Sequence, residues 1–452
     1  MQAKSSSFSL LAGPWQQLAL GIVCMACVAN LQYGWTLFVA PIDAKFHWGR
    51  AAIQVAFSVF VFIETWLIPI EGYLVDRYGP RWVVMVGAVL VALCWVVNSF
   101  ADNLMLLYLG AALGGIGTGC VYGTCVGNAL KWFPGRRGLA AGCTAAGFGA
   151  GAALTVVPIG NMIEAAGYQH TFFVFGILQG SIVLLMALGM VKAPEQAHGV
   201  VAPRHASPHG DCPPARVLRT PLFWVMYAMF VLVAAGGLMM AASLAPIAKD
   251  FRLDKLPVHL LWWTLPALSF ALALDRVLDG VGRPFFGWIS DRIGRENTMF
   301  IAFGIGATAL YTLTRIGADP VGFVIFTALY FGVFGEIYSL FPATQGDTFG
   351  PKFAASNAGM LYTAKGTAAF LVPLAASVAS TYGWTAVFWV AIGFNVAAAL
   401  LALFVLKPMR AGWYAAGARA TETPGAVEAT PLVVESIAAV PAEYSFIDRS
   451  RT

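Results

Sequence analysis

The sequence predicts an all-α membrane protein in which twelve transmembrane helices form two pseudo-symmetric bundles of six. Three observations predict this fold class. The chain of 452 residues is 59% hydrophobic and 11% charged, whereas a soluble domain carries roughly a quarter charged residues. Its apolar residues gather in twelve long stretches. One polar motif also occurs twice, about half a chain apart.

Each apolar stretch is long enough to cross a bilayer, which takes about 20 residues of helix. Six stretches precede a polar segment that contains five prolines, and six follow it. The predicted helices run near 16–42, 50–74, 82–100, 104–130, 138–163 and 170–192, then near 221–247, 258–289, 297–315, 320–342, 353–380 and 385–407.

The repeated motif reads GYLVDRYG at 72–79 and GWISDRIG at 287–294. The copies lie 215 residues apart (287 − 72), and each follows an apolar stretch. The repeat indicates two related halves in one membrane, an organisation typical of proteins that move a solute across it. The repeated acid–base pairs are Asp76 with Arg77 and Asp291 with Arg292.

Polar segments divide the chain into four parts. We predict an N-terminal bundle at 1–192, a cytoplasmic linker at 193–220, a C-terminal bundle at 221–407 and a tail at 408–452. The tail is rich in Ala, Thr, Glu and Pro and has few bulky apolar residues, so we expect it to be disordered.

The distribution of Lys and Arg predicts the orientation. Both termini and the even-numbered loops hold eighteen of these residues, and the odd-numbered loops hold six. Positive charge marks the cytoplasmic side, so both termini are predicted to be cytoplasmic in a bacterial inner membrane. Topology thus explains the net charge of +5, and no nucleic-acid partner is expected.

Several function classes have no signature in the sequence. There is no Ser/His/Asp set, metal-binding cluster or phosphate-cradling loop, so we expect no enzyme, no cofactor, no metal and no ATP-driven pump. Cys24 and Cys27 have the spacing of a redox motif but lie within an apolar stretch, where small apolar packing is the favoured interpretation.

Ionisable residues inside the predicted helices are functional candidates, because each costs a few kcal/mol or more at mid-bilayer. Arg283 and Lys365 are the main cationic candidates. The others are Glu64, Asp275, Arg276, Asp279 and Glu336.

Spacing places part of this set on one helix face. Asp275, Asp279 and Arg283 follow at intervals of four residues, and Arg276 lies three residues before Asp279. Two interpretations remain open for the arginines, namely internal ion pairing and contact with a substrate anion. Lys365 has no acid within one turn of its own helix, which favours an anionic substrate as its partner.

Aromatic residues cluster in the sequence around these charges. Such rings can bracket a flat ligand, and Tyr hydroxyls can donate to carboxylate oxygens; ordinary helix packing is the alternative. The candidates are Tyr33, Tyr122, Phe148, Phe334, Tyr338 and Tyr362.

The two repeated loops resemble the signature loops of the major facilitator superfamily, between helices two and three and helices eight and nine. From near Trp15 to Pro408 the chain resembles, more narrowly, the oxalate:formate antiporter family. The stretches that carry this resemblance are QYGWTL at 32–37, YG at 122–123, RRGLA at 136–140, GRPFFG at 282–287, YSLFP at 338–342, AKGTA at 364–368 and YGWTA at 382–386.

The resemblance implies that Arg283 and Lys365 bind the two carboxylates of oxalate in an aromatic cage. Arginine suits this role because its guanidinium offers a bidentate fork. The N-terminal half would contribute Gln32, Tyr33, Gln54 and Tyr122. By the same resemblance, Asp76 and Asp291 would latch cytoplasmic helix ends. Arg77 and Arg292 would then change partners as the halves rock.

The chain also departs from the family pattern. Phe148 and Phe334 carry no polar group, and Tyr362 stands where a Trp is often found. Four acids, Glu64, Asp275, Asp279 and Glu336, exceed what a dianion site needs, since a nearby carboxylate repels a dianion unless it is protonated or paired. Proton coupling through Glu336 or Glu64 therefore stays open, as does another small carboxylate.

The leading prediction is an exchanger that imports oxalate and exports formate by alternating access. A proton-coupled monocarboxylate transporter with the same fold is the second. A membrane sensor with a degenerate site is the third, and the presence of Arg283 and Lys365 argues against it. We expect a monomer whose partners are a small carboxylate and the lipid bilayer.

Overall fold

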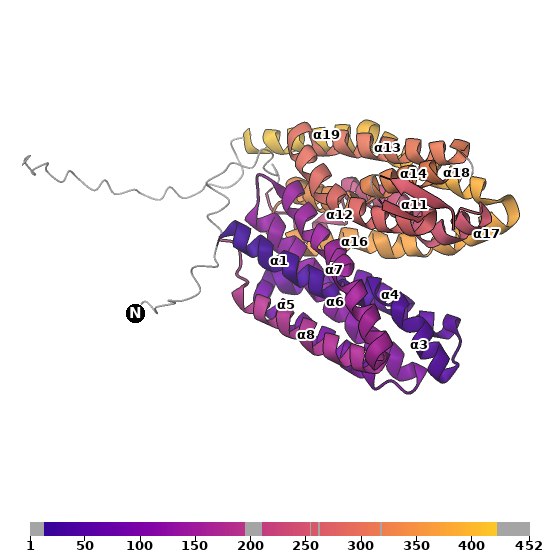
Figure 1. Cartoon of the computed structure of the whole chain (residues 1–452). Coiled ribbons are helices and arrows are strands. Elements are labelled where there is room, and N and C mark those ends of the chain that lie inside the picture. The colour runs from indigo at the N-terminus through magenta and orange to yellow at the C-terminus, as the bar shows by residue number, and fades with distance from the viewer. Residues whose placement is uncertain (1–12, 195–209, 254, 261–262, 317–318, 423–452) are drawn as a thin grey trace, which may run out of the picture.

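A computed structural model describes residues 13–194, 210–253, 255–260, 263–316 and 319–422 of the chain. Figure 1 shows two helical bundles, the N-terminal one in indigo to magenta and the C-terminal one in pink-red through orange to yellow. They lie against each other at α7, α12 and α16 and diverge toward α3 and α17. The molecule is therefore closed at one end and spread apart at the other.

The N-terminal bundle contains eight helices among the described residues. The first predicted span is interrupted near Ala29 and at Gly34-Trp35, which divides it into three helices. The bounds are α1 (Pro14–Val28), α2 (Asn30–Tyr33), α3 (Thr36–Phe46), α4 (Arg50–Tyr78), α5 (Pro80–Ser99), α6 (Leu104–Trp132), α7 (Arg137–Ala166) and α8 (Tyr168–Gly189).

The C-terminal bundle follows a short linker helix, α10 (Pro214–Val217). Its tenth predicted span is divided at Gly335-Glu336 and its eleventh at Phe370-Leu371. The bounds are α11 (Pro221–Asp250), β1 (Pro257–Leu260), β2 (Trp263–Pro266), α12 (Ala267–Ile293), α13 (Arg295–Ile316), α14 (Pro320–Phe334), α15 (Ile337–Phe349), α16 (Ala354–Ala369), α17 (Val372–Tyr382), α18 (Trp384–Leu400), the π-helix η2 (Leu401–Leu406) and α19 (Lys407–Glu422).

Ten helical segments in the described part of the chain are long and apolar enough to cross a membrane. The two predicted spans outside this set are α12, which holds several ionisable residues, and α16 with α17, which are individually short. These two spans carry Arg283 and Lys365. The strongest candidates for a polar site thus lie on the two spans whose composition or continuity fits lipid least well.

The predicted helix 258–289 begins later than expected. Residues 257–260 and 263–266 instead form two antiparallel strands in which Pro257 pairs with Pro266 and Val258 with Leu265. Proline is tolerated at strand ends, and Val, Trp and Thr favour strands. An apolar run this short cannot be assigned to helix or strand by periodicity alone, which explains the error.

The prediction of a disordered tail from residue 408 is wrong for its described part. Residues up to Glu422 continue as α19, and residues 423–452 lie outside the described chain. Three side chains hold α19 against α15. Arg410 donates to the Thr348 hydroxyl, Trp413 to the Thr348 carbonyl and Tyr414 to the Asp347 carbonyl. A few anchoring residues therefore order a segment that is polar on average.

Glycine lets the two bundles approach closely. A Cβ added to Gly142 on α7 would lie only 2.4 Å from the carbonyl oxygen of Arg283 on α12. Small residues allow helix backbones to pack in lipid, where no hydrophobic force drives helices together. This contact sets the backbone of Arg283 directly against the N-terminal half.

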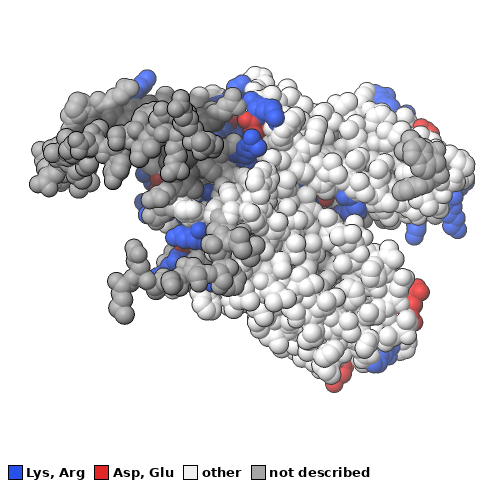
Figure 2. Space-filling view, turned by 60° about the vertical axis from the view of Figure 1, so that its left-hand side comes forward, with Lys and Arg blue, Asp and Glu red and all other residues white. Residues whose placement is uncertain are grey.

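On the face seen in Figure 2, a broad belt of surface carries no Lys, Arg, Asp or Glu. Figure 2 shows Lys, Arg, Asp and Glu gathered toward the ends of the molecule, with a few charges in the hollow between the two bundles. Such a belt is what the hydrocarbon layer of a bilayer requires, because exposed charge is costly there.

Candidate functional site

Arg283 lies on α12 at the junction of the two halves and is 2% exposed. Its Nη2 donates to Oδ2 of Asp279 at 2.6 Å, one turn earlier on the same helix. Its Nη1 donates to the carbonyl oxygen of Ala145 on α7 at 2.8 Å. The guanidinium also lies 4.8 Å from the ring centre of Tyr338. Its ion pair is thus formed within α12, whereas its hydrogen bond to Ala145 joins α12 to the N-terminal half.

Lys365 on α16 is 5% exposed and faces the N-terminal half. Its Nζ lies 3.5 Å from Oε2 of Glu64 on α4. It donates to the hydroxyl of Tyr362 at 3.0 Å and to Oε1 of Gln32 at 3.4 Å. The acid that Lys365 lacks on its own helix is therefore supplied by Glu64 in this structure. The buried pair joins the two bundles.

The six predicted aromatic residues form one continuous series of ring contacts, and two of them, Tyr338 and Tyr362, lie next to Arg283 and Lys365. Tyr33, Phe148 and Tyr122 belong to the N-terminal half, and Tyr362, Tyr338 and Phe334 belong to the C-terminal half. The ring centres are separated by 5.4 Å for Tyr33–Phe148, 5.6 Å for Phe148–Tyr122, 4.7 Å for Tyr122–Tyr362, 6.1 Å for Tyr362–Tyr338 and 6.2 Å for Tyr338–Phe334.

Two predicted site residues are exposed rather than buried. Gln54 is exposed and accepts a hydrogen bond from the Trp35 indole at 3.2 Å. It precedes Glu64 by ten residues, which is about 15 Å along a helix. Arg276 is also exposed and lies 5.6 Å from the Tyr33 ring centre. The predicted stripe of buried charge on α12 thus keeps Asp275, Asp279 and Arg283 but not Arg276.

The remaining predicted acids lie in the core of the C-terminal bundle. Asp275 is 3% exposed and lies near Thr327. Glu336 is fully buried at the break between α14 and α15, and its carboxylate forms no hydrogen bond with any described residue. Neither acid has an ion pair with Arg283 or Lys365 among the described contacts.

Glu71 is a buried acid that the sequence reasoning missed. It lies seven residues after Glu64 on α4, is 4% exposed, and faces Gly119 and Cys120 on α6. It was overlooked because it falls near the predicted end of its helix, where an acid is unremarkable. The signal that could have revealed it is its spacing, since residues seven apart share a helix face.

The repeated aspartates connect the halves in matching ways. Asp76 on α4 accepts hydrogen bonds from the Ser356 amide at 2.9 Å and its hydroxyl at 2.5 Å, in the first turn of α16. Asp291 on α12 accepts from the amides of Gly138 and Leu139, at 3.1 and 3.0 Å, in the first turn of α7. Each acid thus accepts hydrogen bonds from backbone N–H groups that have no partner within their own helix. Its negative charge also lies at the positive end of the dipole of that helix, which belongs to the opposite half.

The repeated arginines have contacts within their own half. Arg77 donates to the Tyr73 hydroxyl at 3.2 Å, and Arg292 stacks on Trp288 at 3.5 Å from the ring centre.

A further ion-pair network, absent from the sequence predictions, links Asp347 on α15 with Arg137 on α7 at 2.8 Å and with Arg295 at 2.9 Å. All these contacts lie at the linker end, defined here as the end that carries α10 and α19.

The linker itself contacts this closed end. The Cys212 amide donates to the Phe349 carbonyl at 2.8 Å, and the Cys212 carbonyl accepts from the Asn357 side chain at 3.1 Å. Burial raises the pKa of the Cys212 thiol above its ordinary value. The residue thus connects the linker to α15 and α16, the helices that hold the closing contacts.

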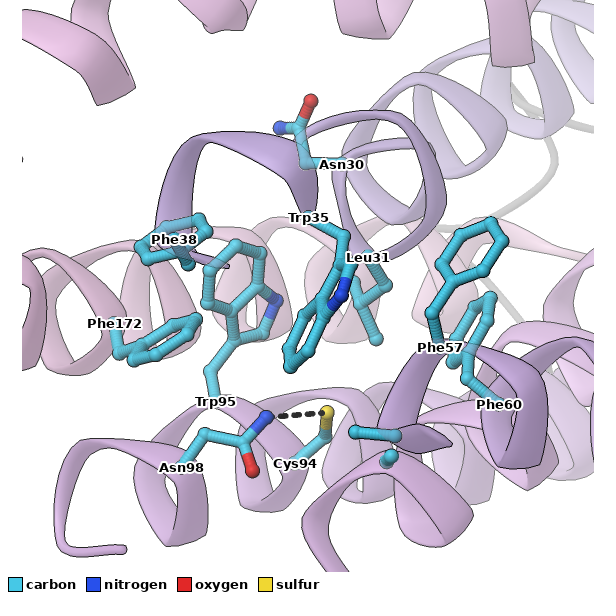
Figure 3. A pocket seen from close by; sticks show the side chains of 12 residues that line it. Asn30, Leu31, Trp35, Phe38, Phe57, Phe60, Cys94, Trp95, Asn98 and Phe172 are labelled. Atoms are coloured by element: carbon cyan, nitrogen blue, oxygen red, sulfur yellow. Dashed lines mark hydrogen bonds between the residues drawn. The ribbon is translucent and has the colours of Figure 1, made fainter. Parts of the chain in front are cut away.

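A separate cavity lies inside the N-terminal bundle and does not contain the predicted cations. Figure 3 shows it lined mainly by aromatic side chains, among them Trp35, Phe38 and Trp95, with Asn30 and Asn98 at its edges. Its volume of about 20 Å³ holds roughly one water molecule. It is too small for a carboxylate, so the candidate site remains the cluster between the bundles.

Two buried cations between two related helical bundles define a class, the multi-pass membrane carrier. Comparison with known proteins supports this class. The profile of the Major Facilitator Superfamily matches residues 19–373 and 237–440. The solved structure of FucP, a major facilitator transporter in the outward conformation, superimposes with a TM-score of 0.64 at 16% identity, covering 86% of this chain and 98% of FucP.

The names of two curated relatives refer to carboxylates. The chain is 33% identical over 409 residues to the oxalate:formate antiporter of Oxalobacter formigenes, covering 89% of this chain and 94% of the relative. It is 28% identical over 281 residues to human monocarboxylate transporter 11, covering 59% and 54%. The chain belongs to the major facilitator superfamily and, within it, to the oxalate:formate antiporter family. The predicted fold class is confirmed.

Proposed function

We propose that the protein is a secondary transporter that exchanges small carboxylates by alternating access, with oxalate entering and formate leaving as the leading pair. The observation that carries the proposal is the placement of Arg283 and Lys365, two buried cations linked by Tyr338 and Tyr362. The 33% identity to an oxalate:formate antiporter supports this pair of substrates.

The site favours replacement of the protein's own carboxylates by those of a substrate. Arg283 holds Asp279, and Lys365 holds Glu64. Removing one partner from a buried ion pair is strongly unfavourable, so neither cation is stable without an anion. A substrate that brings two carboxylates can replace these internal partners at both cations, and the tyrosine hydroxyls can donate to its oxygens.

The contacts at the linker end support alternating access. Asp76, Asp291 and Asp347 hold the halves together there, and the bundles diverge at the opposite end (Figure 1). With the termini in the cytoplasm, as the charge distribution predicts, this is an outward-facing state. We expect a monomer in a bacterial inner membrane, whose halves rock about the site to expose it to the cytoplasm.

Uptake of labelled oxalate into proteoliposomes tests the proposal. Three sets of vesicles are loaded with formate, with oxalate or with buffer alone. Exchange predicts uptake only where a carboxylate is inside. The absence of uptake with either internal carboxylate would refute oxalate exchange.

A proton-coupled monocarboxylate transporter is the second candidate. The observation that favours it is Glu64 next to Lys365, and the similarity to monocarboxylate transporter 11 is consistent with it. Uptake into vesicles that contain only buffer, driven by an imposed pH gradient, would support this candidate over obligatory exchange.

A further inference from the structure

We propose that a substrate carboxylate that binds at Lys365 is accompanied by one proton, which binds to Glu64 as the substrate takes its place in the ion pair. The inference rests on the proposed carboxylate transport and specifies which residue couples it to protons. It begins with the burial of Glu64, which is 0% exposed within α4 and lies 3.5 Å from Lys365.

The surroundings of Glu64 offer no second full positive charge. The titratable groups that face it among the described residues are Lys365 and Tyr362 from α16, Tyr122 from α6, and Glu71 further along α4. The tyrosines are neutral, and Glu71 carries the same charge sign when ionised. Lys365 therefore supplies all of the cationic stabilisation that Glu64 receives from described residues.

The helices that carry this pair pack closely against each other. A Cβ added to Gly366, next to Lys365, would lie 2.6 Å from the Thr65 hydroxyl oxygen and 2.7 Å from Nε1 of Trp66. No other cation lies within ion-pair distance of Glu64 in the described chain. When a substrate carboxylate occupies Lys365, an ionised Glu64 would remain buried without a counter-ion, which is strongly disfavoured.

Charge balance leads to the same result. The empty site contains Arg283 and Lys365 as cations and Asp279 and Glu64 as anions, so its formal charge is zero. A bound monocarboxylate makes it minus one, and one proton restores neutrality. The Glu64 carboxylate gains the proton from the open side, its ion pair with Lys365 breaks, and the ammonium pairs with the substrate carboxylate. On release, the proton leaves and the internal pair re-forms.

Glu64 is better placed for this role than Glu336, the other acid favoured from the sequence. Glu336 is equally buried, but it has no ion pair with either cation and lies at the break between α14 and α15. Its protonation therefore has no described contact through which substrate binding at Lys365 could act. Glu71 shares a helix face with Glu64 but likewise does not pair with Lys365, which makes it a matched control.

Calorimetric titration of the purified full-length protein with formate, and separately with oxalate, tests the proposal. Each titration is run at one pH in two buffers of different ionisation enthalpy, because the difference in observed heat reports protons exchanged on binding. We expect the wild type to take up about one proton per molecule of formate bound. Glu64→Gln should bind carboxylate without this uptake, and Glu71→Gln should retain it.

The outcomes separate this proposal from the proposed function. Carboxylate binding by the wild type without proton uptake would overturn the role of Glu64 alone and leave carboxylate transport standing. Unchanged uptake in Glu64→Gln would also overturn it. Failure of the wild type to bind either carboxylate would overturn both proposals. The wild-type proton count decides the matter even if Glu64→Gln does not fold.

Discussion

Arg283 carries out two tasks with one guanidinium, because it pairs with Asp279 and also donates to the Ala145 carbonyl in the opposite half. A lysine keeps the charge but presents a single compact ammonium rather than a planar fork. The geometry of this residue is therefore as important as its charge.

Arg283→Lys should reduce oxalate exchange by roughly tenfold to a hundredfold, because one charge-assisted hydrogen bond is lost at a buried position. The initial rate of labelled oxalate uptake into formate-loaded vesicles measures this effect. Arg315→Lys, at an exposed position on α13, serves as the control for reconstitution. A wild-type rate in Arg283→Lys would exclude the proposed role of the fork.

Lys365→Ala should destabilise the protein by about 3–5 kcal/mol, because it leaves Glu64 buried without its partner. Oxalate should then give no protection against thermal unfolding. The double variant Glu64→Gln/Lys365→Ala should recover much of the lost stability, since it removes both charges. Equal stability of the single and double variants would show that the pair is not coupled in the folded protein.

At the scale of elements, the closed state depends on helix ends. Asp76 and Asp291 are equivalent positions of the repeat, and each binds the first turn of a helix in the other half. The loop repeat is thus a pair of reciprocal latches. α19 strengthens the same region, because Tyr414 binds the carbonyl of Asp347, which itself bridges Arg137 and Arg295.

Asp76→Asn should accelerate hydrogen exchange at the start of α16, around the Ser356 amide, by roughly tenfold, since a charged acceptor becomes neutral. Exchange measured by mass spectrometry on that peptide reports the change. Asp43→Asn on α3 removes an equivalent acceptor, that of the Gly49 amide just before α4, and should leave α16 unaffected. Unaltered exchange in Asp76→Asn would contradict the latch.

The sequence predicted some elements well and others poorly, for physical reasons. The repeat and the length of the apolar stretches predict the fold, because a spanning helix satisfies its own backbone wherever it lies. The exposure of Gln54 and Arg276 could not be predicted, because helix breaks and helix rotation decide which side chains face the interior. The pairing of Glu64 with Lys365 joins residues about three hundred positions apart, and no local pattern indicates which helices will touch.

At the scale of the whole molecule, exchange of a dianion for a monoanion moves net charge across the membrane. One elementary charge is worth about 2.3 kcal/mol per 100 mV. An interior-negative potential should therefore slow oxalate uptake into formate-loaded vesicles. Potassium gradients with valinomycin set the potential, and formate:formate exchange, which moves no net charge, is the control. Identical oxalate uptake at all potentials would exclude exchange of these two charge states.

The most direct test is a structure of the protein with bound oxalate. We expect the two carboxylates of the ligand within hydrogen-bond distance of Arg283 and Lys365, between Tyr338 and Tyr362, with Lys365 separated from Glu64. A ligand bound elsewhere, with the Lys365–Glu64 pair intact, would contradict the proposal that these two cations carry the substrate.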